Sequence, residues 1–250
     1  MTPVEVSERS FEAAIECGLL QNGPDACAGD STTVHESSPP YGETPGGYLK
    51  RSPADYDRAL CLVPRDVVDF VLATQPKEWD RLKQHYGEAV KDRFLGRIAK
   101  EVESRGALDV LRLGVKDSGC KFALAYFRPA SGLNEEMRRK HAANLFSIVR
   151  QLRYSEKNEN CLDIALFLNG IPIFTAELKN PLNAQTVEDA IRQYKTDRDP
   201  REPLFANGRC LAHFAVDPEL VYVTTHLDGP RTRFLPFNKG KFGGAAGNPP

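Results

Sequence analysis

The chain has 250 residues, and its 33 basic and 34 acidic side chains give a formal net charge of −1. A chain of this length can bury a sizeable core, and its charge excludes whole-molecule attraction to DNA, so DNA binding must be local or come from partners. The six cysteines include no Cys-x-x-Cys pair, so we expect reduced core thiols and a cytoplasmic location. We find no apolar run near the length of a membrane span, so no membrane partner is expected.

The predicted elements begin with an amphipathic helix at residues 7–20, which presents apolar side chains on one side. A stretch rich in Gly, Pro, Ser and Thr follows at residues 21–55, and a helical pattern occupies residues 64–115. Further along, the pattern predicts helices near 134–143 and 186–196 and strands at 121–127, 145–149, 210–217 and 220–227. Between them, residues 161–181 read as two strands joined at Asn169-Gly170, the second ended by Asn180-Pro181. Strands that alternate with helices in this way predict an α/β fold, with a mixed sheet flanked by helices.

The most informative stretch is CLDIALFLNGIPIFTAELKNP, two apolar strands that carry Asp163, Glu177 and Lys179. An ionised carboxylate in an apolar strand is costly unless a cation or a hydrogen-bond donor compensates it. Side chains two apart in a strand share a face, so Glu177 and Lys179 point the same way. The three residues therefore predict a Mg²⁺ site for cutting phosphodiesters, with the Leu178 carbonyl as a further ligand and Lys179 beside the attacking water. A structural ion pair at a sheet edge is the alternative.

This site depends on the register of the hairpin. A two-residue turn at Asn169-Gly170 would pair Asp163 with Ala176 and so place Asp163 on the opposite face from Glu177. An odd-length loop or a bulge would return both carboxylates to one face. We therefore predict an odd-length loop or a bulge in this hairpin.

Long segments of the chain resemble the restriction subunit of type I restriction-modification enzymes. The segments are YSEKNENCLDIALFLNGIPIFTAELKN, TVEDAIRQYKTDRDPREPLF, TRFLPFNKG and the earlier YDRALCLVPRDVVDFVLATQPKEWDRL. The resemblance runs from about residue 7 to the end and implies a nuclease domain of the PD-(D/E)XK superfamily. Asp163, Glu177 and Lys179 match its three core positions, with Leu162 in place of the proline.

The resemblance also implies a domain organisation. Residues 1–20 form the first helix of the nuclease core, 21–119 an irregular loop and helical insertion, and 120–238 the core sheet and helices. Residues 239–250 are a glycine-rich linker toward an ATP-dependent translocase outside this chain. The chain has no Gly-x-x-x-x-Gly-Lys-Ser/Thr phosphate loop, so ATP is expected to act only through that translocase.

Two further groups of site residues follow from the resemblance. Glu12 is the best match for a glutamate that the first helix lends to the metal, and Glu8 and Glu16 are alternatives. Gln193 and Tyr194 are a candidate DNA-binding pair, although the family pattern places glutamine four residues before tyrosine; a packed Tyr194 is the alternative.

Basic residues recur every three positions after this helix begins. If the helix continues, they form a stripe suited to DNA phosphates. The stripe consists of Arg192, Lys195, Arg198 and Arg201.

The resemblance thus implies a Mg²⁺-dependent endonuclease domain that cuts double-stranded DNA without sequence preference, after ATP-driven translocation. Its partners would be the modification and specificity subunits of the type I complex. A stand-alone repair or structure-selective nuclease of the same superfamily is one alternative. A catalytically idle docking domain is the other.

Overall fold

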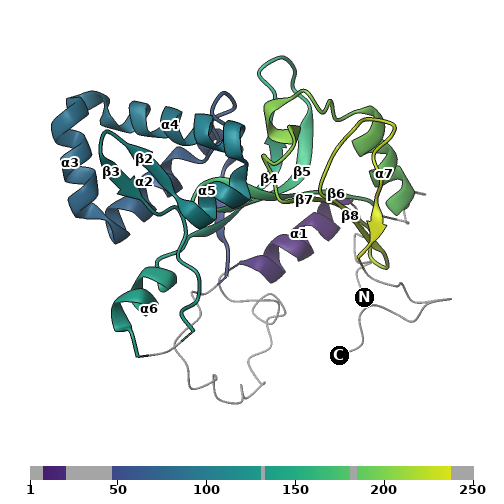
Figure 1. Cartoon of the computed structure of the whole chain (residues 1–250). Helices are drawn as coiled ribbons and strands as arrows, with labels where there is room; N and C mark the ends of the chain where they lie inside the picture. The colour runs from purple at the N-terminus through teal and green to yellow at the C-terminus, as the bar shows by residue number, and fades with distance from the viewer. Residues whose placement is uncertain (1–7, 21–46, 131–132, 181–184, 238–250) are drawn as a thin grey trace.

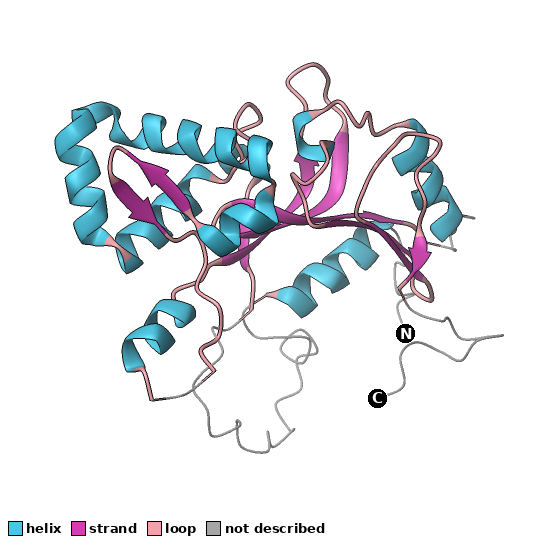
Figure 2. Ribbon diagram, in the orientation of Figure 1, coloured by secondary structure: helices cyan, strands magenta, loops and turns pink. Residues whose placement is uncertain are grey.

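The fold is built on one mixed β-sheet, as the sequence predicts (Figures 1 and 2). The computed structural model describes residues 8–20, 47–130, 133–180 and 185–237. Within these residues the sheet has seven strands, in which the β1–β4 and β6–β7 pairs are parallel and the others antiparallel. In spatial order the strands are β1 (Leu49–Arg51), β4 (Phe146–Arg153), β5 (Cys161–Leu168), β6 (Ile171–Leu178), β7 (Ala212–Val216), β8 (Val221–Thr224) and β9 (Leu235–Pro236).

Two helices cover opposite faces of this sheet, α1 (Glu8–Leu19) and α7 (Val187–Thr196) (Figure 1). Leu178 packs in a cluster with the apolar side of α1, whereas Ala215 packs under α7. Ala215 is paired with Glu177, the strand neighbour of Leu178. Because neighbours in a strand point to opposite faces, Glu177 lies on the α7 side.

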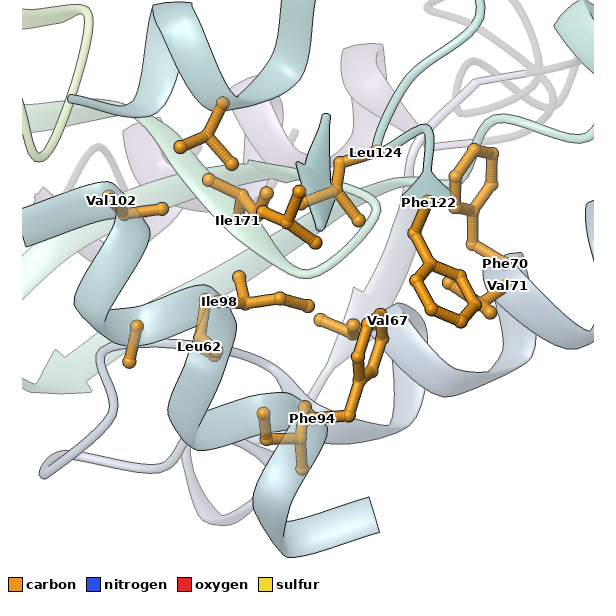
Figure 3. Packing of buried hydrophobic residues seen from close by; sticks show 14 of the residues in the cluster. Leu62, Val67, Phe70, Val71, Phe94, Ile98, Val102, Phe122, Leu124 and Ile171 are labelled. Atoms are coloured by element: carbon orange, nitrogen blue, oxygen red, sulfur yellow. The ribbon is translucent and has the colours of Figure 1, made fainter. Parts of the chain in front are cut away.

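A helical lobe packs against one end of the sheet (Figure 1). Its elements are α2 (Pro64–Thr74), α3 (Pro76–Tyr86), α4 (Val90–Arg105), α5 (Ala107–Leu113) and the hairpin of β2 (Val115–Asp117) and β3 (Cys120–Phe122). Its core, which includes Phe70, Phe94 and Phe122, continues to Ile171 at the start of β6 (Figure 3). The short helix α6 (Glu135–Ala142) then leads back to β4.

The lobe differs in two respects from the insertion expected at residues 21–119. Leu49–Arg51 forms the edge strand β1 of the main sheet, and three residues are too few to give a sequence pattern. The strand expected at 121–127 is reduced to Cys120–Phe122, which pairs with β2 outside the main sheet. The expected irregular loop before residue 47 and the linker at 239–250 lie outside the described residues.

The β5–β6 hairpin contains the predicted bulge. Its turn has two residues, Asn169 and Gly170, with φ values of 50° and 78°. The register then shifts between Leu166 and Phe167, so that Ile173 is the extra residue on β6. The bulge is confirmed, and the odd-length loop is not needed.

The tip of this hairpin is fixed by hydrogen bonds to backbone groups of the surrounding chain. The Asn169 side chain accepts from the Leu145 amide at 2.7 Å and donates to the Leu124 carbonyl at 2.8 Å. The Gly170 carbonyl accepts from the Val63 amide at 2.9 Å, which joins the turn to the start of α2. Both turn residues are therefore held in place, Asn169 by Leu124 and Leu145 and Gly170 by Val63.

The cysteines differ in part from the sequence expectation. Cys61, Cys120, Cys161 and Cys210 are free thiols, whereas Cys17 is disulfide-bonded. The expectation of reduced thiols was wrong for Cys17, because the spacing of the cysteines carries no signal for this bond. No helix within the described residues is long and apolar enough to cross a membrane.

Candidate active site

A cleft of about 550 Å³ opens where α1 meets the ends of β5 and β6. Three of its lining side chains are predicted site residues, namely Glu12, Asp163 and Lys179. The remaining lining residues are Arg9, Arg150 and Gln151. Residues from the first helix and from three strands thus converge on one polar cleft.

Asp163 lies at the point where β5 and β6 separate. The last paired residues are Ile164 and Ala176, and the register carried one step further sets Asp163 opposite Glu177. One oxygen of Asp163, Oδ2, accepts from the Leu178 amide at 2.8 Å, so its carboxylate replaces the next ladder hydrogen bond. The bulge therefore brings Asp163 beside Glu177, which a regular two-residue hairpin would not do.

Glu177 has one satisfied and one unsatisfied oxygen. Oε1 accepts from Nε of Arg198 at 2.6 Å, whereas the buried Oε2 has no hydrogen-bond partner among the described residues. Complete burial raises the pKa of Glu177 to about 8, against the opposing charge of Arg198, and the nearby Asp163 raises it further. An uncompensated oxygen beside a second carboxylate requires a proton or a cation.

Lys179 follows β6 directly and lines the same cleft as Asp163. Its backbone amide donates to the Val216 carbonyl at 2.9 Å, which continues the β6–β7 ladder and fixes the position of its Cα. The residue is 9% exposed. The end of the strand thus places Lys179 at the cleft.

Glu12 is the first-helix glutamate that reaches the cleft. It is buried, and its carboxylate accepts from Nη2 of Arg150 at 2.9 Å and from Nε2 of Gln151 at 2.8 Å. Burial raises its pKa, and Arg150 opposes the shift. Of the alternatives, Glu16 is not a lining residue and pairs with Arg150 and Lys50, and the side chain of Glu8 lies outside the described part of the structure.

Arg150 and Gln151 are cleft residues that sequence reasoning missed. The signal was present, because the run LFSIVRQLR places two polar side chains in the middle of an apolar strand. Such residues in a strand need partners, and here they find Glu12 and Asp163.

Arg198 is not the exposed DNA-binding residue that the sequence predicts. Helix α7 ends at Thr196, so Arg198 does not continue the expected stripe. It lies beside Glu177 on the α7 side of the sheet, where its side chain is only 4% exposed. Besides Glu177 it binds the Cys161 carbonyl at 2.6 Å and lies close to the hydroxyl of Tyr154 at 3.4 Å. It therefore joins β5, β6 and the end of β4.

Tyr194 is packed, which was the alternative to a DNA contact. Its hydroxyl lies 2.8 Å from Oγ1 of Thr175, and its ring is fully buried. Gln193 and Lys195 are half-buried, and Arg192 is exposed. Together with Arg201, the exposed last member of the predicted stripe, these three side chains remain within reach of an external ligand.

The comparisons with known proteins place the chain in a family. A sequence model described as the type I restriction enzyme R protein N terminus matches residues 77–232. The chain belongs to this family. The matched part includes Asp163, Glu177 and Lys179, whereas α1 with Glu12 lies outside it. Neither the comparison with curated proteins nor that with solved structures found a match.

Membership of the R protein N-terminal family supports a restriction-enzyme nuclease domain, of the hydrolase class and within a restriction system. The R protein of this family is a component of type I restriction enzymes, which suggests that the chain is part of a multi-subunit restriction complex. The α/β architecture, with helices on both faces of a mixed sheet, is consistent with a nuclease-like core.

The residues of this R-protein domain suit a hard divalent cation. The described residues include no group of three His, Cys, Asp or Glu side chains close enough to form a ready cluster. The donors at the cleft are nevertheless carboxylate oxygens, which Mg²⁺ prefers, and the unpartnered Oε2 of Glu177 lies beside Asp163. Because Mg²⁺ keeps several waters, two carboxylates are enough to hold it.

Proposed function

We propose that this domain is the Mg²⁺-dependent endonuclease of a type I restriction enzyme R subunit and hydrolyses phosphodiester bonds in double-stranded DNA. The observation that carries the proposal is the junction of Asp163 and Glu177, with an uncompensated buried oxygen, next to a cleft that also holds Lys179. Membership of the R-protein family supports it.

Each residue has a distinct role in this proposal. Asp163 and Glu177 hold the cation, with the Leu178 carbonyl and Glu12 as further ligands. Bound Mg²⁺ supplies an acidified water and neutralises charge that develops on the phosphate. Lys179 orients the water that attacks phosphorus, since the residue lines the same cleft as Asp163. The water oxygen forms a new bond to phosphorus and its proton passes to solvent, while the phosphorus–oxygen bond to the leaving sugar breaks and the leaving oxygen takes up a proton from solvent.

The wider setting of the reaction belongs to the same proposal. The domain acts in the cytoplasm with modification and specificity subunits, and it cuts without sequence preference after ATP-driven translocation. The charge of −1 supports this division of labour, because the chain has no overall attraction for DNA and depends on partners to deliver it. ATP acts through a separate translocase, since the 250 residues contain no phosphate-loop motif.

The test replaces Lys179 by methionine in the assembled restriction enzyme and measures DNA cleavage and ATP hydrolysis separately. Methionine keeps the apolar stem and removes the amine, so we expect cleavage to fall by at least about 100-fold while ATP hydrolysis persists. Lys121→Met is the matched control, because Lys121 is an exposed lysine in the β2–β3 hairpin, outside the cleft lining. It should leave both activities unchanged.

A second arm separates a nuclease from an idle docking domain. The double variant Asp163→Ala, Glu177→Ala removes both proposed cation ligands. We expect it to abolish cleavage by the complex. Wild-type cleavage by the double variant would refute the proposed function and support the docking alternative.

A further inference from the structure

Gln151 has an unusual backbone for a residue in the middle of a strand. Its φ is 49°, in the left-handed region, where a residue with a Cβ is strained. Regular pairing continues on both sides of it, between Arg150 and Ile164 and between Leu152 and Leu162. The surrounding strands therefore impose this conformation on Gln151.

The consequence is a change of side-chain direction at this one position. Val149 and Leu152 both pack in the core cluster on the α7 side, although they are three residues apart. In a regular strand such residues point to opposite faces. The left-handed residue between them absorbs the difference and leaves its own side chain exposed in the cleft.

The Gln151 amide then bridges two proposed cation ligands. Its Nε2 lies 2.8 Å from Oε1 of Glu12 and 3.3 Å from Oδ1 of Asp163. The two N–H groups can serve one carboxylate each, which is the compensation that a shared cation would otherwise provide. A Mg²⁺ ion binds oxygen at about 2.1 Å, roughly 1 Å closer than an amide nitrogen does, so the amide holds these carboxylates wider apart than a bridging ion requires.

We propose that the Gln151 amide competes with the divalent cation. It lies between Glu12 and Asp163, and it would have to withdraw for a cation to take up their oxygens. Gln151 is thus a positioning residue that lowers the affinity of the site for metal. The inference rests on the proposed function, since it concerns the cation of that site.

The experiment titrates the full 250-residue chain with Mn²⁺ by calorimetry and follows thermal unfolding with and without the ion. Gln151→Ala removes the competing amide, so the Kd for Mn²⁺ should fall about tenfold, which is about 1.4 kcal/mol. The metal-free variant should unfold at a lower temperature, because Glu12 and Asp163 lose a shared donor. Saturating Mn²⁺ should raise its unfolding temperature more than it raises that of the wild type.

Two further variants keep the test decisive. Gln151→Gly removes the same amide and accepts φ of 49° without strain, so it should show the same gain in Mn²⁺ affinity and a higher metal-free unfolding temperature than the alanine variant. Gln84→Ala, an exposed glutamine on α3, should change neither affinity nor the response to the ion.

The outcomes distinguish the two proposals. If the wild type binds Mn²⁺ and both Gln151 variants bind it equally or more weakly, the competitor role is wrong. Weaker binding would instead make Gln151 a ligand through its oxygen. If neither the wild type nor any variant binds Mn²⁺, the proposed metal-dependent function fails.

Discussion

Gly170 gives the sharpest test of how the hairpin that carries Glu177 is anchored. A Cβ at this position would lie 2.4 Å from the Val63 carbonyl oxygen and 2.9 Å from the Val67 backbone nitrogen. Both are backbone atoms at the start of α2, so the contact cannot be relieved by rotating a side chain. Gly170→Ala must therefore move the turn away from the lobe and break the hydrogen bond from the Val63 amide.

The stability lost in Gly170→Ala has two contributions, and a control variant separates them. The left-handed φ of 78° alone costs an alanine about 1–2 kcal/mol, and the lost turn contact adds about 2 kcal/mol or more. Gly119 has a φ of 80° and nothing within 4 Å of its hypothetical Cβ, so Gly119→Ala reports the first part only. We expect Gly170→Ala to lower the free energy of unfolding in urea by about 2 kcal/mol more than Gly119→Ala does. Equal losses would refute the anchoring of the turn on α2.

Two further predictions concern buried ionisable side chains, His213 and Arg198. Burial lowers the pKa of His213 to about 4, whereas its value in the unfolded chain is 6.5. The stability of the fold is therefore unaffected by the titration of this residue above pH 6.5. Stability is lost as the pH falls from 6.5 through 4, by about 3 kcal/mol in total. In denaturant unfolding the stability gap between the wild type and His213→Gln should therefore shrink from pH 7.5 to pH 4, and a constant gap would contradict this. Arg198→Met removes the donor to both buried Glu177 and the Cys161 carbonyl and should cost about 3 kcal/mol, whereas Arg201→Met removes an exposed pair and should cost less than about 1 kcal/mol. Equal losses of folding free energy in these two variants would show that the buried Arg198–Glu177 pair stabilises the fold no more than the exposed Arg201–Asp199 pair does.

The sequence allowed the acidic pair and the bulge to be predicted because both follow from the two-residue period of a strand. Charged residues in apolar strands need partners on their own face, and the length of the turn determines which face that is. The position of Glu12 followed from the resemblance, and the structure places that residue at the cleft.

The parts that could not be predicted depend on contacts distant in sequence. Whether Arg198 lies on a helix or under the sheet depends on where α7 ends, and its partner Glu177 is twenty-one residues away. The left-handed backbone of Gln151 results from packing on both sides of β4, which no local pattern reports. β1 has three residues, fewer than a periodicity needs.

The extra residue at Ile173 decides which face of the sheet receives Glu177. The turn is fixed on α2, and Glu177 is reached from it by a set number of residues along β6. Deleting one residue between the two would shift Glu177 by one position and turn its side chain from the α7 side to the opposite face, away from Arg198. The interval from Gly170 to Glu177 in this chain therefore cannot change in length by one residue without separating Glu177 from its buried partner.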